Sequence, residues 1–263
     1  MDRRKGFLLT SAALVLSAFI CLMLYNFDNK YTRQAPQPIS GVLFLSENDL
    51  VQTPVCFLIR EWEFFPEVLL TPEKSSDYDG YRRYVDIGAP HGMMTHGSCT
   101  YRLTLMLPEH EATYALELPE IFSACRLFVD GEPMLELGEP SPEHYTEGIA
   151  NRVVLFTAAG RTELLLNVSD FSGVYSGMTS PPAFGTADGV LRQREIRLLL
   201  HGATVLLALM GMALALAFGL RGNRRRGILC WLICLCLIAI VGYPLVHSLL
   251  ITDFQPWYTI EIS

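Results

Sequence analysis

The stretch SCTYRLTLML, residues 98–107, decides the fold class of the region around it. Apolar side chains recur at every second position from Tyr101 to Leu105, and the polar Arg102 and Thr104 lie between them. This period of two is typical of a β-strand with one buried face, whereas a helix repeats its apolar residues every three or four positions. The stretch therefore predicts a strand in a layered β-structure.

Similar strand patterns continue on both sides of this stretch. The segment CRLFVDGEPMLEL, residues 125–137, predicts a β-hairpin, because Asp130-Gly131 supplies the positive φ angles that a tight turn requires. Prolines and glycines separate the candidates, and no helical period of useful length lies between them. The pattern predicts an all-β domain, an antiparallel β-sandwich or jelly roll. The other predicted strands are Val55–Phe65, Thr113–Leu118, Val153–Phe156 and Thr162–Val168.

Three long apolar segments flank this β-rich region. Residues 7–25, 198–220 and 227–251 contain no Asp, Glu, Lys or Arg. Each is long enough, as a helix, to cross a hydrocarbon core about 30 Å thick. The first exceeds the usual length of a cleaved signal segment and lacks a small-residue cleavage pattern after it, which favours an uncleaved signal anchor. The sequence therefore predicts a multi-pass membrane protein with three transmembrane helices.

Basic residues predict the orientation of these helices, because short loops rich in Lys and Arg stay on the cytoplasmic side. They place residues 1–6 and 221–226 in the cytoplasm and residues 26–195 and 252–263 outside it. The topology-setting residues are Arg3, Arg4, Lys5, Arg221, Arg224, Arg225 and Arg226.

Composition excludes some functions for the predicted outer segment. Residues 26–195 carry 24 Asp and Glu against 12 Lys and Arg, so we expect no nucleic acid as partner. The segment is long enough for one domain with a sizeable core. Its three cysteines are Cys56, Cys99 and Cys125, which allow at most one internal disulfide and leave open which pair, if any, is bonded.

Catalytic motifs do not occur in the chain. The segment GVYSG, residues 173–177, has its serine one place too late for a nucleophile elbow, and neither a Gly-rich phosphate loop nor an H-E-x-x-H helix occurs. Glu61 and Glu63 flank Trp62 on a predicted strand, where we expect both carboxylates to be solvated. The chain as given is predicted to be neither an enzyme nor a cofactor-binding protein.

The stretch HGMMTHG, residues 91–97, combines two imidazoles with two thioethers. His91, Met93, Met94 and His96 are a reasonable ligand set for Cu(I). The alternative is an ordinary loop that enters the next strand with its methionines packed beneath it. Because nothing in the sequence fixes a ligand geometry, the loop is the favoured interpretation.

Four stretches in order carry a resemblance to a known family. They are REWEFFPEVLLTPE (60–73), GSCTYRLTLMLP (97–108), LPEIFSACRLFVDGEPMLELGEP (118–140) and LLNVSDFSGVYSGMTSPPAFG (165–185). With the apolar segments that follow, the chain resembles bacterial seven-transmembrane receptors with diverse intracellular signalling modules. The resemblance implies a galactose-binding-like jelly roll outside the plasma membrane and a membrane bundle that couples it to a histidine kinase or a cyclase. The chain stops after three apolar segments and contains neither module, so we expect a truncated receptor, with a short natural protein as the alternative.

The resemblance also implies that the outer domain binds a small molecule or a glycan. Aromatic side chains would stack on sugar rings and arginine would hold hydroxyls. Trp62 also fits a core position, and the cluster from Tyr81 to Tyr84 also fits a plain exposed loop. The candidate ligand-binding residues are Trp62, Tyr81, Arg82, Tyr84 and Tyr145.

The segment LRQREIRLLL, residues 191–200, is predicted to be a helix that links the outer domain rigidly to the second apolar segment, because no Gly or Pro interrupts it. Together these features predict the sensor portion of a bacterial transmembrane receptor. Its expected partners are the lipid bilayer, a small-molecule or carbohydrate ligand and, through the membrane helices, a second copy of the chain. The alternatives are a membrane-tethered carbohydrate-binding or structural module that does not signal, and an accessory subunit of a transporter.

Overall fold

The computed structural model describes residues 30–31, 34–75, 77–78, 80–88, 97–141, 144–171, 177–221 and 224–249. The chain divides into two compact units, Met1–Gln34 and Ala35–Ser263, and all elements below belong to the second. The predicted signal anchor and the basic residues Arg3, Arg4 and Lys5 lie outside the described residues.

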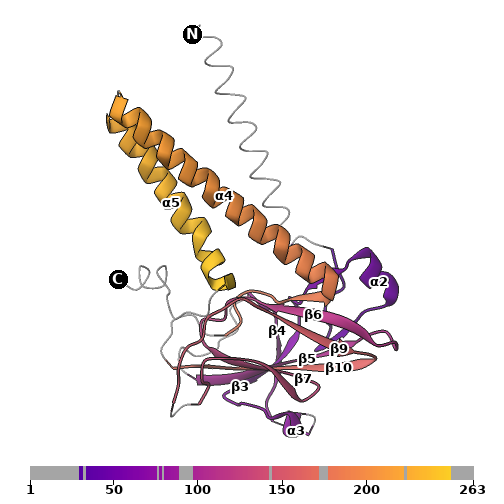
Figure 1. Ribbon diagram of the computed structural model, residues 1–263. Helices are drawn as coiled ribbons and strands as arrows, with labels where there is room; N and C mark the ends of the chain where they lie inside the picture. The colour runs from indigo at the N-terminus through magenta and orange to yellow at the C-terminus, as the bar shows by residue number, and fades with distance from the viewer. Residues whose placement is uncertain are drawn as a thin grey trace. The chain divides into compact units, whose positions relative to one another are not determined.

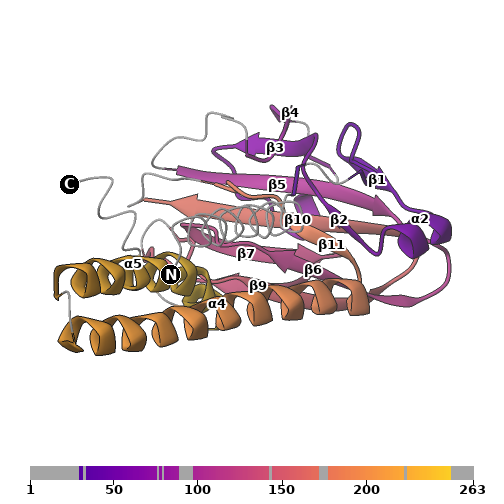
Figure 2. The ribbon, with the colours of Figure 1, turned by 90° about the horizontal axis from the view of Figure 1, so that it is seen from above.

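Two β-sheets pack face to face, which confirms the predicted β-sandwich (Figures 1 and 2). The seven-stranded sheet has the order β4-β3-β5-β10-β7-β8, with β1 beside β5, and the four-stranded sheet has the order β2-β11-β6-β9. Among the strands in the described residues, every pairing is antiparallel except that of β1 with β5. The strands are β1 Val42–Phe44, β2 Val55–Phe57, β3 Trp62–Pro66, β4 Arg83–Val85, β5 Gly97–Met106, β6 Ala112–Leu118, β7 Ala124–Val129, β8 Glu132–Leu137, β9 Arg152–Ala158, β10 Arg161–Asp170 and β11 Ala183–Thr186.

The predicted hairpin is confirmed at residue level. Strands β7 and β8 pair up to Val129 and Glu132, and the two residues between them, Asp130 and Gly131, have φ angles of 48° and 87°. Both positive angles are what a two-residue turn needs to match the twist of the strands. The Asp130 carboxylate also accepts the backbone N–H of Glu163 at 2.7 Å, which ties the turn to β10.

Alternate residues of the strands fill the space between the sheets. Phe64, Tyr101 and Leu103 from the larger sheet and Leu116 and Phe184 from the smaller one belong to one continuous buried cluster. The alternation predicted for residues 98–107 therefore holds on the inner face of β5.

Part of the outer face of the seven-stranded sheet is covered, and here the expectation that Glu63 is solvated is wrong. Val68, Leu70 and Tyr78, from the segment after β3 that includes the short helix α3 (Pro72–Ser75), pack against Phe65 and Leu165. Under this cover Arg102 and Glu63 are each only 8% exposed, not solvated. The alternating pattern revealed one buried face, but the cover also buries part of the second face, at Thr100 and Arg102 of β5.

The predicted strand Val55–Phe65 is also wrong, because it is two strands in different sheets. β2 belongs to the four-stranded sheet and β3 to the seven-stranded sheet. The chain crosses between them at residues 58–61, where Glu61 has a φ of 47° and the Trp62 indole donates to the carbonyl of Leu58 at 2.9 Å. A continuous run of apolar residues hides this crossing, since both ends contribute to the same core.

Three further helices complete the described part of this unit. The short helix α2 (Glu47–Gln52) starts at a capping box in which Ser46 and Asp49 bond each other's backbone. The long helices α4 (Ala187–Arg221) and α5 (Arg224–Leu249) run side by side (Figure 1). They approach closely at Gly211, where a Cβ would lie 3.0 Å from the Cys234 sulfur.

One helix in the described part of the chain is long and apolar enough to cross a membrane, over Ala187–Ala217. The apolar stretch found in α5, Gly227–Ile240, is shorter. Of the three predicted transmembrane helices, length and composition thus support one here. The last β-strand ends at Thr186 and α4 begins at once, before the predicted end of the outer segment at Glu195.

Candidate functional site

The predicted ligand-binding residues lie in different environments. Tyr81 and Tyr84 are 70% and 45% exposed, and Arg82 between them is half exposed, so these three, named the exposed patch below, lie at the surface on or just before β4. Trp62 is 1% exposed and lies in the core, where it presents no ring face to solvent. Tyr145 is half-buried, and its ring packs edge-on against Phe171 at 5.5 Å between centroids.

A carboxylate that sequence reasoning placed in solvent lies beside this patch. Glu63 Oε2 accepts from Arg102 Nε at 2.6 Å, and Glu63 Oε1 lies 3.7 Å from Arg82 Nη1. Glu63 is also the direct cross-strand neighbour of Tyr84. Two guanidinium groups, one buried and one exposed, therefore share a single buried carboxylate. The buried Arg102–Glu63 ion pair offsets part of the desolvation cost of its two charges. A single unpaired charge buried there would cost several kcal/mol in stability.

Further hydrogen bonds attach the covering segment to the sheet. Arg102 Nη1 donates to the carbonyl of Ser75, and the Ser75 hydroxyl donates to Glu163 Oε1 at 2.6 Å. Asn167 Nδ2 donates to the carbonyl of Leu70 at 3.0 Å. The Arg102 guanidinium also lies over the Phe65 ring, 5.0 Å from its centroid. The segment that leads to the exposed patch is thus fixed on the sheet by buried polar groups.

The joint between the sandwich and helix α4 is the second candidate site. Strand β11 ends at Thr186, and α4 starts at Ala187 without a linker. The Thr186 hydroxyl accepts the backbone N–H of Gly189 at 3.2 Å, as a helix N-cap does. One turn later Val190 is fully buried in an apolar cluster on the outer face of the four-stranded sheet, with Val55, Phe57, Ala115 and Ala183.

About two turns after Val190, a buried ion pair holds α4 on the sheet. Arg197 donates from Nη1 and Nη2 to the two carboxylate oxygens of Glu117 on β6, at 3.1 and 3.3 Å. The Glu117 side chain is only 5% exposed and that of Arg197 17% exposed. Two parallel bonds of this kind fix orientation as well as distance. The helix is therefore held on the sheet at residues 190 and 197.

Two further arginines lie at this joint. Arg194 Nη2 donates to the carbonyl of Ser248 at 2.8 Å, which joins α4 to the end of α5. Arg152 Nη1 donates to the carbonyl of Asn151 at 2.9 Å. Burial, and then the nearby charge of Arg194, lower the pKa of Arg152 from its usual value. Arg152 on β9 and Arg194 on α4 thus lie close enough for their charges to interact where the sandwich meets the helices.

Sequence reasoning identified residues 191–200 as a rigid helical link, and α4 runs without a break through them. It missed Glu117, because the partner of Arg197 lies 80 residues earlier in the chain. No short-range pattern marks such a pair. The only signal was an acid in the apolar strand TYALEL.

The possible metal ligands His91, Met93, Met94 and His96 lie outside the described residues. Within the described ranges, no group of three or more His, Cys, Asp or Glu side chains is placed to hold a metal ion. Cys56, Cys99 and Cys125 are all buried thiols that form no disulfide with one another. Burial raises the pKa of Cys125 to about 12, so this thiol stays protonated at neutral pH.

Comparison with known protein families and with curated proteins gives no match. Solved structures similar to this chain include the GH2 beta-galacturonidase from Eisenbergiella tayi, with 15% identity and a TM-score of 0.34 over 50% of this chain and 24% of that one. The beta-glucuronidase of Faecalibacterium prausnitzii has 13% identity and a TM-score of 0.37, over 50% and 31% of the two chains. The beta-D-mannosidase of Dictyoglomus thermophilum has 10% identity and a TM-score of 0.36, over 50% and 22%.

The matched part is about a third or less of each of these enzymes, and their low identity and TM-scores carry no functional argument. The resemblance to seven-transmembrane receptors remains a prediction, as do the roles of the candidate ligand-binding residues.

Proposed function

We propose that this chain is the sensor portion of a bacterial transmembrane receptor. In this proposal the sandwich binds a small molecule or glycan, and α4 transmits the resulting conformational change into the membrane. The observation that carries it is the linker-free joint of β11 and α4, held by Val190 and by the Arg197–Glu117 pair. A rigid joint transmits a rotation or a shift, whereas a flexible linker absorbs it.

The proposed topology is multi-pass. α4 and α5 form a helical hairpin. α4 ends at Arg221, and α5 begins with Arg224 and Arg225. These arginines favour a cytoplasmic position for the tip of the hairpin. The sandwich then lies outside the plasma membrane. A reporter fused after Arg226 should behave as cytoplasmic and one fused at Gly138 as extracytoplasmic; the opposite pattern would contradict this orientation.

The proposed ligand contacts are the exposed patch of Tyr81, Arg82 and Tyr84. Two aromatic rings beside an exposed guanidinium suit a sugar, because rings stack on its apolar face and arginine donates to its hydroxyls. The buried Glu63–Arg102 pair holds the strand beneath the patch, so the patch is supported by rigid structure.

The mechanism we propose is a shift between two helix arrangements. A ligand moves such an equilibrium only as far as its affinity differs between the two states. Output would come from a histidine kinase or cyclase module that this chain does not contain. The rival is a tether that binds a surface glycan and passes nothing to its helices.

Hydrogen exchange on the chain in lipid nanodiscs tests the proposal. A panel of neutral and acidic mono- and oligosaccharides is screened first for binding. A bound sugar should then slow exchange both at residues 81–84 and in α4 from residue 187 onward. A Gly-Ser insertion after Gln193 should remove the effect on α4 beyond the insertion and keep the effect at the patch.

The same insertion after Glu109, in an exposed turn, is the matched control and should change neither effect. Binding without any change in α4 of the unmodified chain would favour the tether. Absence of binding to every sugar in the panel would contradict the carbohydrate form of the proposal.

A further inference from the structure

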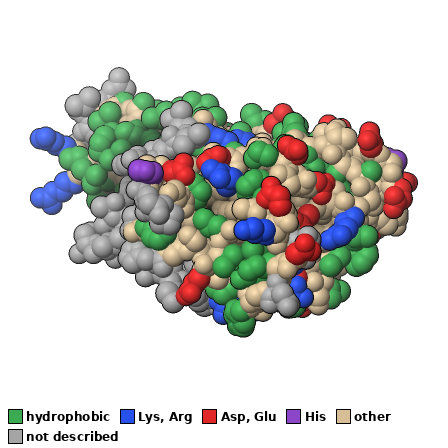
Figure 3. All heavy atoms as spheres, turned by 90° about the horizontal axis from the view of Figure 1, so that it is seen from below, with side chains coloured by type: hydrophobic (Ala, Val, Ile, Leu, Met, Phe, Trp, Pro, Cys, Tyr) green, Lys and Arg blue, Asp and Glu red, His purple; other side chains and the backbone are tan. Residues whose placement is uncertain are grey.

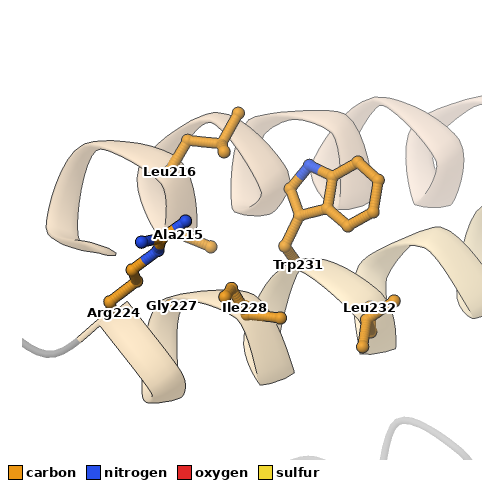
Figure 4. A pocket seen from close by; sticks show the side chains of 7 residues that line it. All are labelled: Ala215, Leu216, Arg224, Gly227, Ile228, Trp231 and Leu232. Atoms are coloured by element: carbon orange, nitrogen blue, oxygen red, sulfur yellow. The ribbon is translucent and has the colours of Figure 1, made fainter. Parts of the chain in front are cut away.

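A cavity opens between the end of α4 and the beginning of α5. It has a volume of about 620 Å³, within the range of about 300–1,000 Å³ that is common for small-ligand sites. Its walls are almost entirely apolar, and Arg224 is the charged side chain that lines it. Figure 4 shows Arg224 and Trp231 both reaching from α5 toward α4. The residues that line it are Ala215, Leu216, Arg224, Gly227, Ile228, Trp231 and Leu232.

The charge of Arg224 has no counterpart in the surrounding sequence. No Asp or Glu occurs between Glu195 and Asp253, so neither helix offers a carboxylate near the tip of the hairpin. Arg221, Arg225 and Arg226 add positive charge there. Acidic side chains do lie among basic ones on the sandwich surface (Figure 3). The sandwich, however, adjoins the beginning of α4, not the tip of the hairpin at its end. Arg224 is exposed at the tip, so an anion from outside the hairpin can reach its guanidinium without competition from a carboxylate of either helix.

Cavity and charge together specify the chemistry of the occupant. Leu216, Ile228 and Leu232 provide an apolar wall that suits a hydrocarbon chain. A guanidinium at the rim suits a phosphate, which it binds with two parallel hydrogen bonds. Basic pockets between transmembrane helices on the cytoplasmic side bind anionic lipid headgroups by this combination.

We propose that the α4–α5 cavity is a binding site for an anionic phospholipid of the cytoplasmic leaflet, with its phosphate on Arg224 and an acyl chain against Leu216, Ile228 and Leu232. This site rests on the proposed membrane topology. In this proposal a lipid fills the gap between α4 and α5. The packing of the two helices then depends on the lipid composition of the membrane.

Trp231 reports on the site directly, because brominated acyl chains quench a nearby indole. The chain has three tryptophans. Trp62 is buried in the sandwich core, and Trp257→Phe removes the third, so lipid quenching in that variant comes from Trp231. Vesicles of phosphatidylcholine receive the same small fraction of brominated phosphatidylglycerol or of brominated phosphatidylcholine.

Brominated phosphatidylglycerol should quench Trp231 more strongly, with an apparent enrichment of about fivefold at the site, the preference that one basic side chain provides. Arg224→Gln should reduce this ratio to the level that the remaining arginines of the tip provide, and Arg224→Lys, which keeps the charge but loses the two parallel hydrogen bonds, should retain only part of it. Arg225→Gln removes the same charge from a residue that does not line the cavity, so it is the matched control and should leave the ratio nearly unchanged.

Other results would overturn the site and identify the cause. Equal quenching by the two lipids, or equal loss of preference in Arg224→Gln and Arg225→Gln, would show unspecific attraction at the tip, with the membrane topology intact. Quenching that weakens as the ratio of protein to lipid rises would show that a second copy fills the cavity. Absence of quenching by either lipid would refute the membrane position of α5, and the site with it.

Discussion

Removal of one partner from the buried Arg102–Glu63 pair should destabilise the sandwich strongly. In Arg102→Met, the Glu63 carboxylate stays buried and loses its 2.6 Å bond, while its remaining cation, Arg82, lies 3.7 Å away and is half exposed. The carbonyl of Ser75 loses a donor as well. Stranding a buried charge in this way costs about 3–5 kcal/mol in the free energy of unfolding.

The double variant Arg102→Met, Glu63→Leu should recover most of that loss. Replacing a whole buried pair by apolar side chains of similar volume is often neutral or stabilising, because both desolvation penalties vanish. Urea unfolding of the full chain measures these effects through Trp62, which lies in the sandwich core, with Trp231 and Trp257 replaced by phenylalanine. A loss of about 4 kcal/mol moves the midpoint by about 2 M at an m-value of about 2 kcal/mol per M.

The pair Arg126–Glu136 across β7 and β8 is the matched control, because both side chains are partly exposed. Arg126→Met should cost less than about 1 kcal/mol, as exposed pairs do. The reasoning fails if Arg102→Met costs no more than Arg126→Met, since Arg102 would then be neither desolvated nor paired as described. It also fails if the double variant is as unstable as Arg102→Met.

Three further predictions use the same unfolding and labelling assays. Gly131→Val should lower the free energy of unfolding by about 1–2 kcal/mol or more, because Gly131 has a φ of 87° that a β-branched residue rarely adopts; an unchanged midpoint would contradict the turn. Burial raises the pKa of Cys125 to about 12 and also raises the pKa of Cys99. Both thiols should resist alkylation at pH 8 and react once urea unfolds the sandwich, as mapped by mass spectrometry. Rapid reaction in the native chain would contradict their burial. Gly211→Leu should separate α4 from α5 near Cys234 and increase hydrogen exchange in both helices, whereas unchanged exchange would show that the close approach is not needed.

Local patterns predicted those parts of the fold that depend on near neighbours in the sequence. The alternation in residues 98–107 and the Asp130-Gly131 turn each involve contacts within a few positions, and the structure has both. The uninterrupted helix through residues 191–200 is of the same kind. Propensity and periodicity act at this range, so the sequence displays them directly.

Features that depend on distant partners escaped prediction. The burial of Glu63 depends on Arg102, 39 residues later, and on the covering segment. Because neither is near Glu63 in the sequence, the local pattern predicted a solvated carboxylate. The split of Val55–Phe65 depends on which sheet each half joins, and an apolar run satisfies either choice. Glu117 carries no local mark of its pairing with Arg197. In each case the neighbouring residues in the sequence fit both possible placements of the residue or segment equally well. No local pattern therefore tells one placement from the other.

The contacts of the core link the proposed ligand patch to the helix joint. Arg83, next to Tyr84 on β4, lies over the Phe64 ring at 5.0 Å, and Phe64 packs against Tyr101 with 5.1 Å between centroids. The hydroxyl of Tyr101 accepts the backbone N–H of Met178 at 3.2 Å.

Met178 lies just before β11, and β11 continues directly into α4. Close-packed side chains of this kind resist compression and transmit a displacement instead of absorbing it. In the proposed receptor, a ligand that shifts β4 would act through these contacts on Met178, in the segment that leads into β11. Because β11 has no linker to α4, the first turn of the helix would follow a displacement of β11. The buried hydroxyl of Tyr101 gives this route a polar contact with defined geometry, where packing alone would allow the neighbouring chains to slide.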